Sequence, residues 1–258
     1  MLEAQAPPAE TCERCGGEGW VAVVENGRRV ARPCDCRSRE QGPRLLAEAG
    51  IPARYAACSL ANFRTSSGTQ RSDPRLHEAL AVCRRYVDGF LGLDGRFRET
   101  GLLFIGPPGV GKTHLAAAVL AEIVGRYRVR GRFVDFSSLL HQIQSTFAPG
   151  SPESKHDVLD PVIEAELLVL DELGAQKPTA WVTDILYLVM NSRYTRRLPT
   201  LFTTNFRLDE SAPGRIAGEP LSARIPALLV SRLCEMAQPV LLDCDDFRRE
   251  IKLQQHRI

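Results

Sequence analysis

Residues 106–113 read Gly-Pro-Pro-Gly-Val-Gly-Lys-Thr, which is the complete spacing of a phosphate-binding loop. The apolar run 102–105 precedes the loop, and a stretch with helical character, 114–124, follows it. This order of strand, glycine loop and helix matters because backbone N–H groups and the helix N-terminus then face the same anion. The alternative, a chance glycine-rich turn, explains neither the full spacing nor the flanking segments.

The loop predicts a site for ATP and Mg²⁺. In loops of this kind the lysine reaches the β- and γ-phosphates and the hydroxyl binds the metal, and here these residues are Lys112 and Thr113. The residues expected to contact the nucleotide or its metal are Gly106, Pro107, Pro108, Gly109, Val110, Gly111, Lys112, Thr113, His114 and Asp171.

Two further polar positions follow apolar runs. Asp171 and Glu172 come directly after 167–170, so Asp171 can hold Mg²⁺ together with Thr113, and Glu172 can polarise the attacking water. Asn205 ends the run 200–204 and could hydrogen-bond the attacking water or the γ-phosphate. Taken alone, an acidic pair can be a solvated turn, and an asparagine after a strand is usually a turn residue.

The composition is that of an ordinary soluble protein, with 44% apolar and 25% charged residues in a chain of 258. A formal charge of +2 does not by itself indicate nucleic-acid binding. No apolar run approaches the ~18 residues that span a membrane, so no membrane partner is expected. Residues 1–10 lack a cationic flank and an apolar core, so they do not form a signal peptide, and we expect a cytoplasmic protein.

The alternation of apolar and amphipathic segments predicts an α/β fold. Continuous apolar strands suit a parallel sheet covered on both faces, which gives a three-layer α/β/α domain with five strands. The expected strands are 101–105, 132–136, 166–170, 200–204 and 239–243, and the expected helices are 112–125, 137–147, 178–194 and 221–236. The expected organisation is a disordered tail at 1–10, a cysteine module at 11–40, a linker at 41–75 and the nucleotide domain at 76–258, which opens with an amphipathic helix from Leu76.

Four of the eight cysteines are clustered, at Cys12, Cys15, Cys34 and Cys36. Two close pairs of thiolates can complete the tetrahedral Cys₄ shell of a structural Zn²⁺. The residues between them read as a hairpin, 20–24 and 29–31, around an Asn-Gly turn. We therefore predict a zinc-stapled module too small to fold without its metal, and redox-active or incidental thiols are the alternative.

The ordered set 106–113, 171–172 and 203–205, followed by Ser231-Arg232-Leu233, resembles an AAA+ ATPase. Within that superfamily the chain is similar to replicative-helicase loaders of the DnaC/DnaI type. Further stretches carry this resemblance between about residues 50 and 250, namely 51–55, 59–63, 171–175 with Trp181, 191–194, 198–200 and 246–248.

The resemblance implies an ATPase that forms an ATP-dependent open ring or spiral and acts with a replicative helicase and single-stranded DNA. It also implies that Arg232 reaches the γ-phosphate bound by a neighbouring subunit, although a surface salt-bridge arginine is the alternative. Arg193 and Arg224 are weaker candidates for that contact. Only 53 residues follow Asn205, so we expect neither a helical lid nor the arginine that such a lid supplies. By the same resemblance, the cysteine module is expected to dock onto the helicase.

Two regions could touch DNA. Arginines alternate at positions 126, 128, 130 and 132, and they could neutralise phosphates or could equally form a solvated rim. The segment 137–159 is longer than a minimal crossover, and in related loaders an extra helix at this place lines the DNA path. Phe147 and the loop 149–154 mark the expected end of that insertion.

The first functional hypothesis is a helicase loader that delivers a replicative hexameric helicase to single-stranded DNA in replication initiation or restart. The second is a transposition helper ATPase of the IS21 type, which acts with a transposase. A kinase or GTP switch is less favoured, because Asn205 is followed by Phe-Arg-Leu-Asp rather than by a guanine-reading Lys-x-Asp. A binding module that only senses ATP is a further alternative, since weak hydrolysis suffices for a switch.

Overall fold

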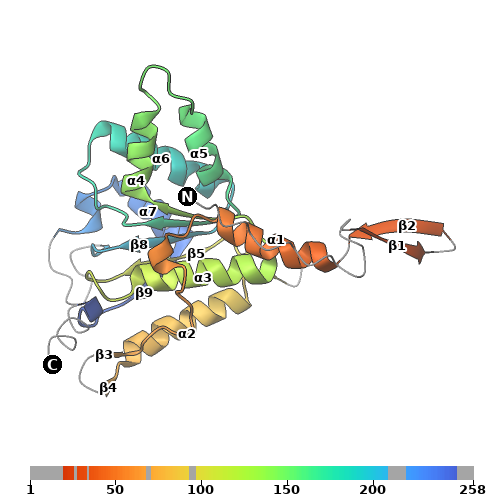
Figure 1. Cartoon of the computed structure of the whole chain (residues 1–258). Coiled ribbons are helices and arrows are strands. Elements are labelled where there is room, and N and C mark those ends of the chain that lie inside the picture. The colour runs from red at the N-terminus through yellow and green to blue at the C-terminus, as the bar shows by residue number, and fades with distance from the viewer. Residues whose placement is uncertain are drawn as a thin grey trace, which may run out of the picture. The chain divides into compact units, whose positions relative to one another are not determined.

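In the computed structural model, the alternating segments build a five-stranded parallel sheet between two layers of helices (Figure 1). The structure describes residues 20–25, 28–33, 35–67, 71–92, 97–208 and 219–248. The chain divides into two compact units, Met1–Arg44 and Leu45–Ile258.

The first unit contains the predicted hairpin. Strand β1 (Trp20–Glu25) pairs antiparallel with β2 (Arg28–Pro33), and Val23 lies opposite Val30. The turn at 26–27 lies outside the described residues, as do Cys12, Cys15 and Cys34, and the side chain of Cys36 is not described either. Elsewhere, among the side chains that are described, no group of three or more His, Cys, Asp or Glu could hold a metal ion. The hairpin is therefore confirmed, while the zinc site stays a prediction.

The sheet of the second unit has the strand order β6-β7-β8-β5-β9, and every neighbouring pair is parallel. The strands are β5 (Gly101–Ile105), β6 (Gly131–Asp135), β7 (Leu167–Asp171), β8 (Thr200–Thr204) and β9 (Ala237–Leu241). The predicted class, an α/β fold with five parallel strands, is confirmed. Strand β8 lies between β5 and β7, so the segments that follow these three strands meet at one edge of the sheet.

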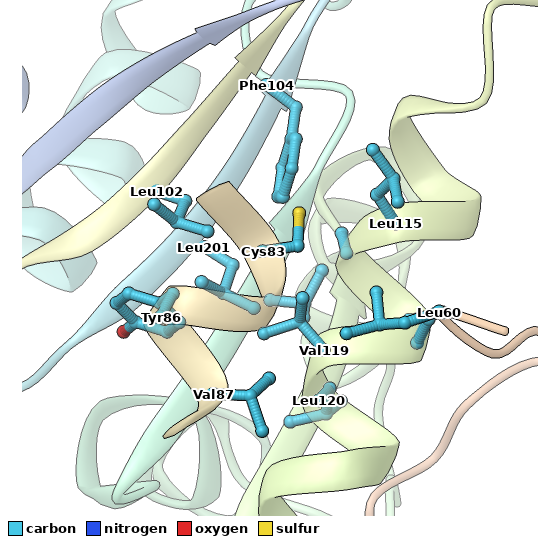
Figure 2. Packing of buried hydrophobic residues seen from close by; sticks show 14 of the residues in the cluster. Leu60, Cys83, Tyr86, Val87, Leu102, Phe104, Leu115, Val119, Leu120 and Leu201 are labelled. Carbon is cyan, nitrogen blue, oxygen red and sulfur yellow. The ribbon is translucent and has the colours of Figure 1, made fainter. Parts of the chain in front are cut away.

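Alternate residues of each strand enter two separate cores. Leu102 and Phe104 of β5 pack with helices α2 (Pro74–Asp88) and α3 (Lys112–Tyr127) on one face, as Figure 2 shows. Leu103 and Ile105 enter the core on the other face. The helices of that second face are α4 (Phe136–Ser145), α5 (Lys155–Glu164), α6 (Ala180–Thr195) and α7 (Ala227–Met236).

Three features differ from the expected elements. Helix α5 follows α4, so the long crossover contains a helical pair rather than one helix and a loop. The segment predicted as one helix over 221–236 is split by Pro226 into a 3₁₀ turn (Leu221–Ala223) and α7. The short strands β3 (Ser66–Ser67) and β4 (Arg71–Ser72) precede α2.

The stretch expected as a linker, 41–75, carries structure. Helix α1 (Asp35–Glu48) crosses the expected boundary at residue 40, and a 3₁₀ turn, η1, covers Ala53–Tyr55. Leu60 and Phe63 are buried in the core beneath α3. The expected boundary was placed at glycine and proline breakers, but apolar residues between those breakers pack onto the core of the second unit. No helix among the described residues is long and apolar enough to span a bilayer.

Candidate nucleotide-binding site

The phosphate loop joins β5 to the first turn of α3. Lys112 is the first residue of α3, and its Nζ donates to the carbonyl oxygens of Gly106 at 2.9 Å and Pro107 at 2.8 Å. Gly109 and Gly111 have left-handed φ angles of 85° and 93°, which glycine adopts without strain. A Cβ on Gly111 would also lie 2.8 Å from the Phe63 ring, so the loop requires glycine there for two reasons.

The Lys112 ammonium lies in a buried position. Its side chain is only 7% exposed, and this burial lowers its pKa to about 8. Asp171 opposes the shift, while Arg248 adds to it. A buried ammonium is disfavoured unless negative charge faces it, so the loop is arranged to favour an anionic ligand.

Asp171 ends β7 and faces the loop. Its Oδ1 accepts a hydrogen bond from Thr113 Oγ1 at 3.0 Å and another from Thr203 Oγ1 at 2.5 Å. Burial raises the pKa of Asp171, and these two hydrogen bonds oppose that rise. The predicted pair of Thr113 and Asp171 is thus in direct contact, although the two residues are far apart in sequence.

Glu172 follows Asp171 in a left-handed conformation, with φ 60°. Its backbone N–H donates to Thr203 Oγ1 at 2.9 Å, and the N–H of Leu173 donates to the Thr203 carbonyl at 2.8 Å. Left-handed backbone is costly for a residue with a side chain, and strand β8 supplies the bonds that hold it. The exposed Glu172 side chain therefore faces the pocket described next.

A pocket opens over the loop. Its lining residues are Arg54, Tyr55, Pro108, Gly109, Gly111, Lys112, Thr113, His114, Glu172, Thr203, Asn205 and Arg248. Four residues that we expected to contact the nucleotide or its metal do not line the pocket. The carbonyl oxygens of Gly106 and Pro107 accept hydrogen bonds from Lys112, and Asp171 accepts one from Thr113. The fourth, Val110, is buried in the core. His114 lines the pocket, and its Nε2 lies 3.1 Å from the carbonyl oxygen of Ser59.

Four lining residues were not among the expected site residues: Arg54, Tyr55, Thr203 and Arg248. Arg248 brings a guanidinium to this pocket from the segment that follows β9, not from a helical lid. The segment before it packs on the loop, since the Phe247 N–H donates to the Gly109 carbonyl at 3.3 Å and Asp246 lies against Gly109. All four lie in stretches that carry the family resemblance, 51–55, 203–205 and 246–248, and this resemblance was their signal in the sequence.

With this geometry in view, the comparison with known proteins is specific. The family model of IstB-like ATP-binding proteins matches residues 72–254. The chain belongs to this family. It is 27% identical over 216 residues to the phage-like element PBSX protein XkdC of Bacillus subtilis, covering 80% of this chain and 77% of that protein. It is 28% identical over 185 residues to the replicative helicase loader DnaC of Escherichia coli, covering 70% of this chain and 68% of DnaC.

Among solved structures, a crystal structure of the DnaC helicase loader matches with a TM-score of 0.61 and 29% identity. The match covers 74% of this chain and 99% of that one. The predicted resemblance to loaders of the DnaC type is therefore confirmed, and this member of the IstB-like family shares the ATP-binding fold of that group.

Of the three residues expected to act on the γ-phosphate in this IstB-like protein, two lie together and one does not. Glu172 and Asn205 both line the pocket. Arg232 lies on α7, where its guanidinium stacks on tyrosines of α6 instead of lining the pocket of its own chain. The role of Arg232 at a neighbouring subunit therefore stays a prediction.

The two weaker candidates for the contact with a neighbouring subunit, Arg193 and Arg224, form hydrogen bonds within their own chain. Arg193 is 0% exposed and donates to Thr200 Oγ1 and to carbonyl oxygens around the end of α5, so it cannot reach another subunit. Arg224 donates to the carbonyl oxygens of Gly174 at 3.0 Å and Ala175 at 3.2 Å. The sequence indicated arginines in the C-terminal half of the nucleotide domain as candidates. Only the packing shows which of their guanidinium groups already have hydrogen-bond partners within the chain.

The alternating arginines between the last turn of α3 and β6 mostly have partners. Arg126 pairs with Asp88 at 2.6 Å, Arg130 with Glu166 at 3.7 Å, and Arg132 donates to the carbonyl oxygen of Glu48 at 3.2 Å. The pairs formed by Arg126 and Arg130 offset part of the positive charge that a DNA phosphate would meet.

Proposed function

We propose that this protein is an ATP-controlled loader that holds a replicative hexameric helicase and delivers it to single-stranded DNA. The observation that carries the nucleotide part is the 3.0 Å contact between Thr113 and Asp171 beside the buried Lys112. The helicase part is supported by the named role of E. coli DnaC, which is similar over 70% of this chain.

The donor set fits Mg²⁺, since a hydroxyl and a carboxylate are the hard oxygen ligands that this ion prefers. When bound with ATP, the ion neutralises charge on the β- and γ-phosphates. Lys112 must exchange the carbonyl oxygens of its own loop for phosphate oxygens, which converts a buried cation into a paired one. Tyr55 and His114 offer aromatic faces in the same pocket for the base.

Hydrolysis is assigned to Glu172, which polarises water, and to Asn205, which orients that water or the γ-phosphate. Arg248 is proposed to contact the phosphates from the same chain. Arg232 is proposed to complete the site of the next copy, so that the active form is an ATP-dependent homo-oligomer. We expect slow turnover that the helicase or DNA stimulates.

The helical pair α4–α5 is the proposed DNA contact. These helices stand side by side, and the loop between them carries Phe147, which is 61% exposed (Figure 1). Bases of a single strand stack well on exposed aromatic rings. The arginine series at the start of β6 is a less favoured contact because of its internal pairs.

The decisive experiment offers the purified protein two partners separately, the host replicative helicase and an IS21-type transposase, with and without ATP. We expect retention of the helicase and ATP-dependent loading of it onto single-stranded DNA, measured as strand unwinding. Lys112→Ala should abolish binding of a fluorescent ATP analogue and reduce loading to background, because the phosphates lose their buried cation.

Lys177→Ala is the matched control, because Lys177 is exposed and far from the loop in sequence. Retention of the transposase instead of the helicase would replace the loader proposal with the transposition helper. Undiminished ATP binding by Lys112→Ala would contradict the nucleotide site itself.

A further inference from the structure

Arg232 lies between two aromatic rings at the surface formed by α6 and α7. Its Cζ is 5.3 Å from the ring centroid of Tyr187 and 5.3 Å from that of Tyr194. A guanidinium near the face of an aromatic ring is attracted by the negative face of the ring. Two rings therefore fix the position of a long side chain that would otherwise sample many rotamers.

The positive charge of Arg232 is not neutralised by a carboxylate in the described part of the chain. Glu235 lies three residues later on α7, a spacing at which an arginine and a glutamate commonly pair. Instead, Glu235 Oε2 accepts a hydrogen bond from Tyr194 Oη at 2.9 Å. Arg232 Nη1 is buried and has no hydrogen-bond partner among the described residues. The guanidinium thus retains its charge and at least one unused donor.

The surroundings of Arg232 suit a surface that another protein covers. Tyr187 is 40% exposed, and Leu188 on α6 and Leu228 on α7 are also exposed. Interface cores are enriched in tyrosine and arginine and poor in acidic side chains. Because no carboxylate of the described chain pairs with the Arg232 guanidinium, this group is suited to bind an anion supplied by another molecule.

We propose that Tyr187 and Tyr194 are positioning residues that hold Arg232 ready for the triphosphate bound by a neighbouring copy of this chain. This inference rests on the shared site assigned above. Cation–π attraction holds the guanidinium without using its N–H groups as hydrogen-bond donors to a neighbouring oxygen, so the guanidinium keeps donor capacity for phosphate oxygens. Tyr194 has a second task, because its hydroxyl keeps Glu235 away from Arg232.

The test measures ATP turnover and ATP-analogue affinity for Tyr187→Leu, Tyr187→Phe, the double variant Tyr187→Leu/Tyr194→Leu, and Arg232→Ala. We expect kcat to fall about threefold for Tyr187→Leu and about tenfold for the double variant, as expected from the loss of one and two cation–π contacts. KM and analogue affinity should stay unchanged, because the rings do not line the pocket of their own chain. Tyr187→Phe keeps the ring and should keep wild-type turnover.

A mixing experiment separates positioning from folding. The double tyrosine variant has an intact Glu172, whereas Glu172→Gln has an intact Arg232, so mixed oligomers contain competent junctions. We expect the mixture to exceed the summed activity of its parts. Failure to recover activity, or a loss of nucleotide affinity in the tyrosine variants, would show a structural role and overturn the proposal.

Arg232→Ala separates the positioning role of the tyrosines from the shared nucleotide site on which that role depends. If it lowers turnover while the tyrosine variants match wild type, the positioning role is overturned and the shared site stands. If Arg232→Ala itself keeps wild-type turnover, the shared site is overturned and the positioning role with it.

Discussion

Two charged residues of the phosphate site, Lys112 and Asp171, are buried, at 7% and 5% exposure. Burial shifts their pKa values in opposite directions, lowering that of Lys112 and raising that of Asp171, because it disfavours both charged forms. Hydroxyl groups of Thr113 and Thr203 compensate at Asp171, and loop carbonyls do so at Lys112. The nucleotide-free site is therefore costly to form, and we expect ligand binding to recover part of that cost.

Replacing Lys112 with methionine tests the cost of its charge. The folded state releases the lysine proton near pH 8, whereas the unfolded chain keeps it up to about pH 10.5. The unfolded state thus binds more protons between these values, so wild-type stability should rise with pH there. We expect the stability of wild type to rise relative to Lys112→Met by up to about 3 kcal/mol between about pH 7 and about pH 10, because the variant has no lysine proton to lose.

Urea unfolding without nucleotide, at several pH values, measures this difference. The variant lacks the hydrogen bonds to the loop carbonyls at every pH, so their loss shifts the stability difference by a constant amount. The part of the difference that changes with pH therefore reports the buried charge of Lys112. Lys177→Met, at an exposed position, should follow wild type throughout. A stability difference that does not change with pH would refute the assigned burial effect.

At the scale of elements, Arg193 joins three of them. It belongs to α6, it donates to Thr200 Oγ1 at the start of β8, and it donates to the carbonyl oxygen of Ala165 just after α5. Burial lowers the pKa of this arginine to about 9, and no carboxylate is bonded to it in the described structure. Carbonyl groups replace the counter-ion, so Arg193 acts as an internal cap for the end of α5.

Arg193→Met should therefore be strongly destabilising. The substitution leaves several buried carbonyl groups without a donor, and we expect a loss of about 3 kcal/mol or more in the free energy of unfolding. Arg196→Met is the matched control, because Arg196 is exposed and its 3.9 Å pair with Glu164 is worth little. Chemical denaturation of both variants provides the comparison, and equal stabilities would contradict the capping role.

At the scale of the whole molecule, the chain combines a small hairpin unit with a second, larger unit that has two cores of its own. The hairpin β1–β2 alone is too small to be stable in water. A structural metal is one of the few ways to stabilise a unit of this size. In the predicted zinc module, the clustered cysteines on either side of the hairpin in the sequence would supply the ligands that such a metal needs.

We predict about one zinc per full-length chain, lost in Cys12→Ser. ATP-analogue affinity should not change, because the nucleotide pocket is built within the second unit. Cys234→Ser is the control, since Cys234 is an exposed free thiol of the second unit and its loss should leave the zinc content unchanged. Elemental analysis of the purified proteins measures the zinc content of each variant. A wild-type protein without zinc would refute the predicted zinc site.

Much of the site was readable in the sequence because its signals are local. The loop 106–113 with its preceding apolar run fixed β5 and the start of α3, and the run before Asp171 predicted β7 close to its observed bounds. Boundaries were less accurate where proline or packing intervened, as at Pro226 before α7. Helix α5 was not assigned, because its apolar residues are few and a proline lies within it.

The sequence by itself determined that the chain binds a nucleoside triphosphate, because the loop, the acidic pair and the order of elements are properties of short segments. Only the tertiary structure decided that β8 lies between β5 and β7, which lets one hydroxyl of Thr203 bond both Asp171 and the backbone of Glu172. The tertiary structure also places Arg248 in the lining of the pocket and buries Arg193 in the core. Strand order and side-chain burial depend on contacts between distant segments, and the local pattern of residues does not encode which segments meet.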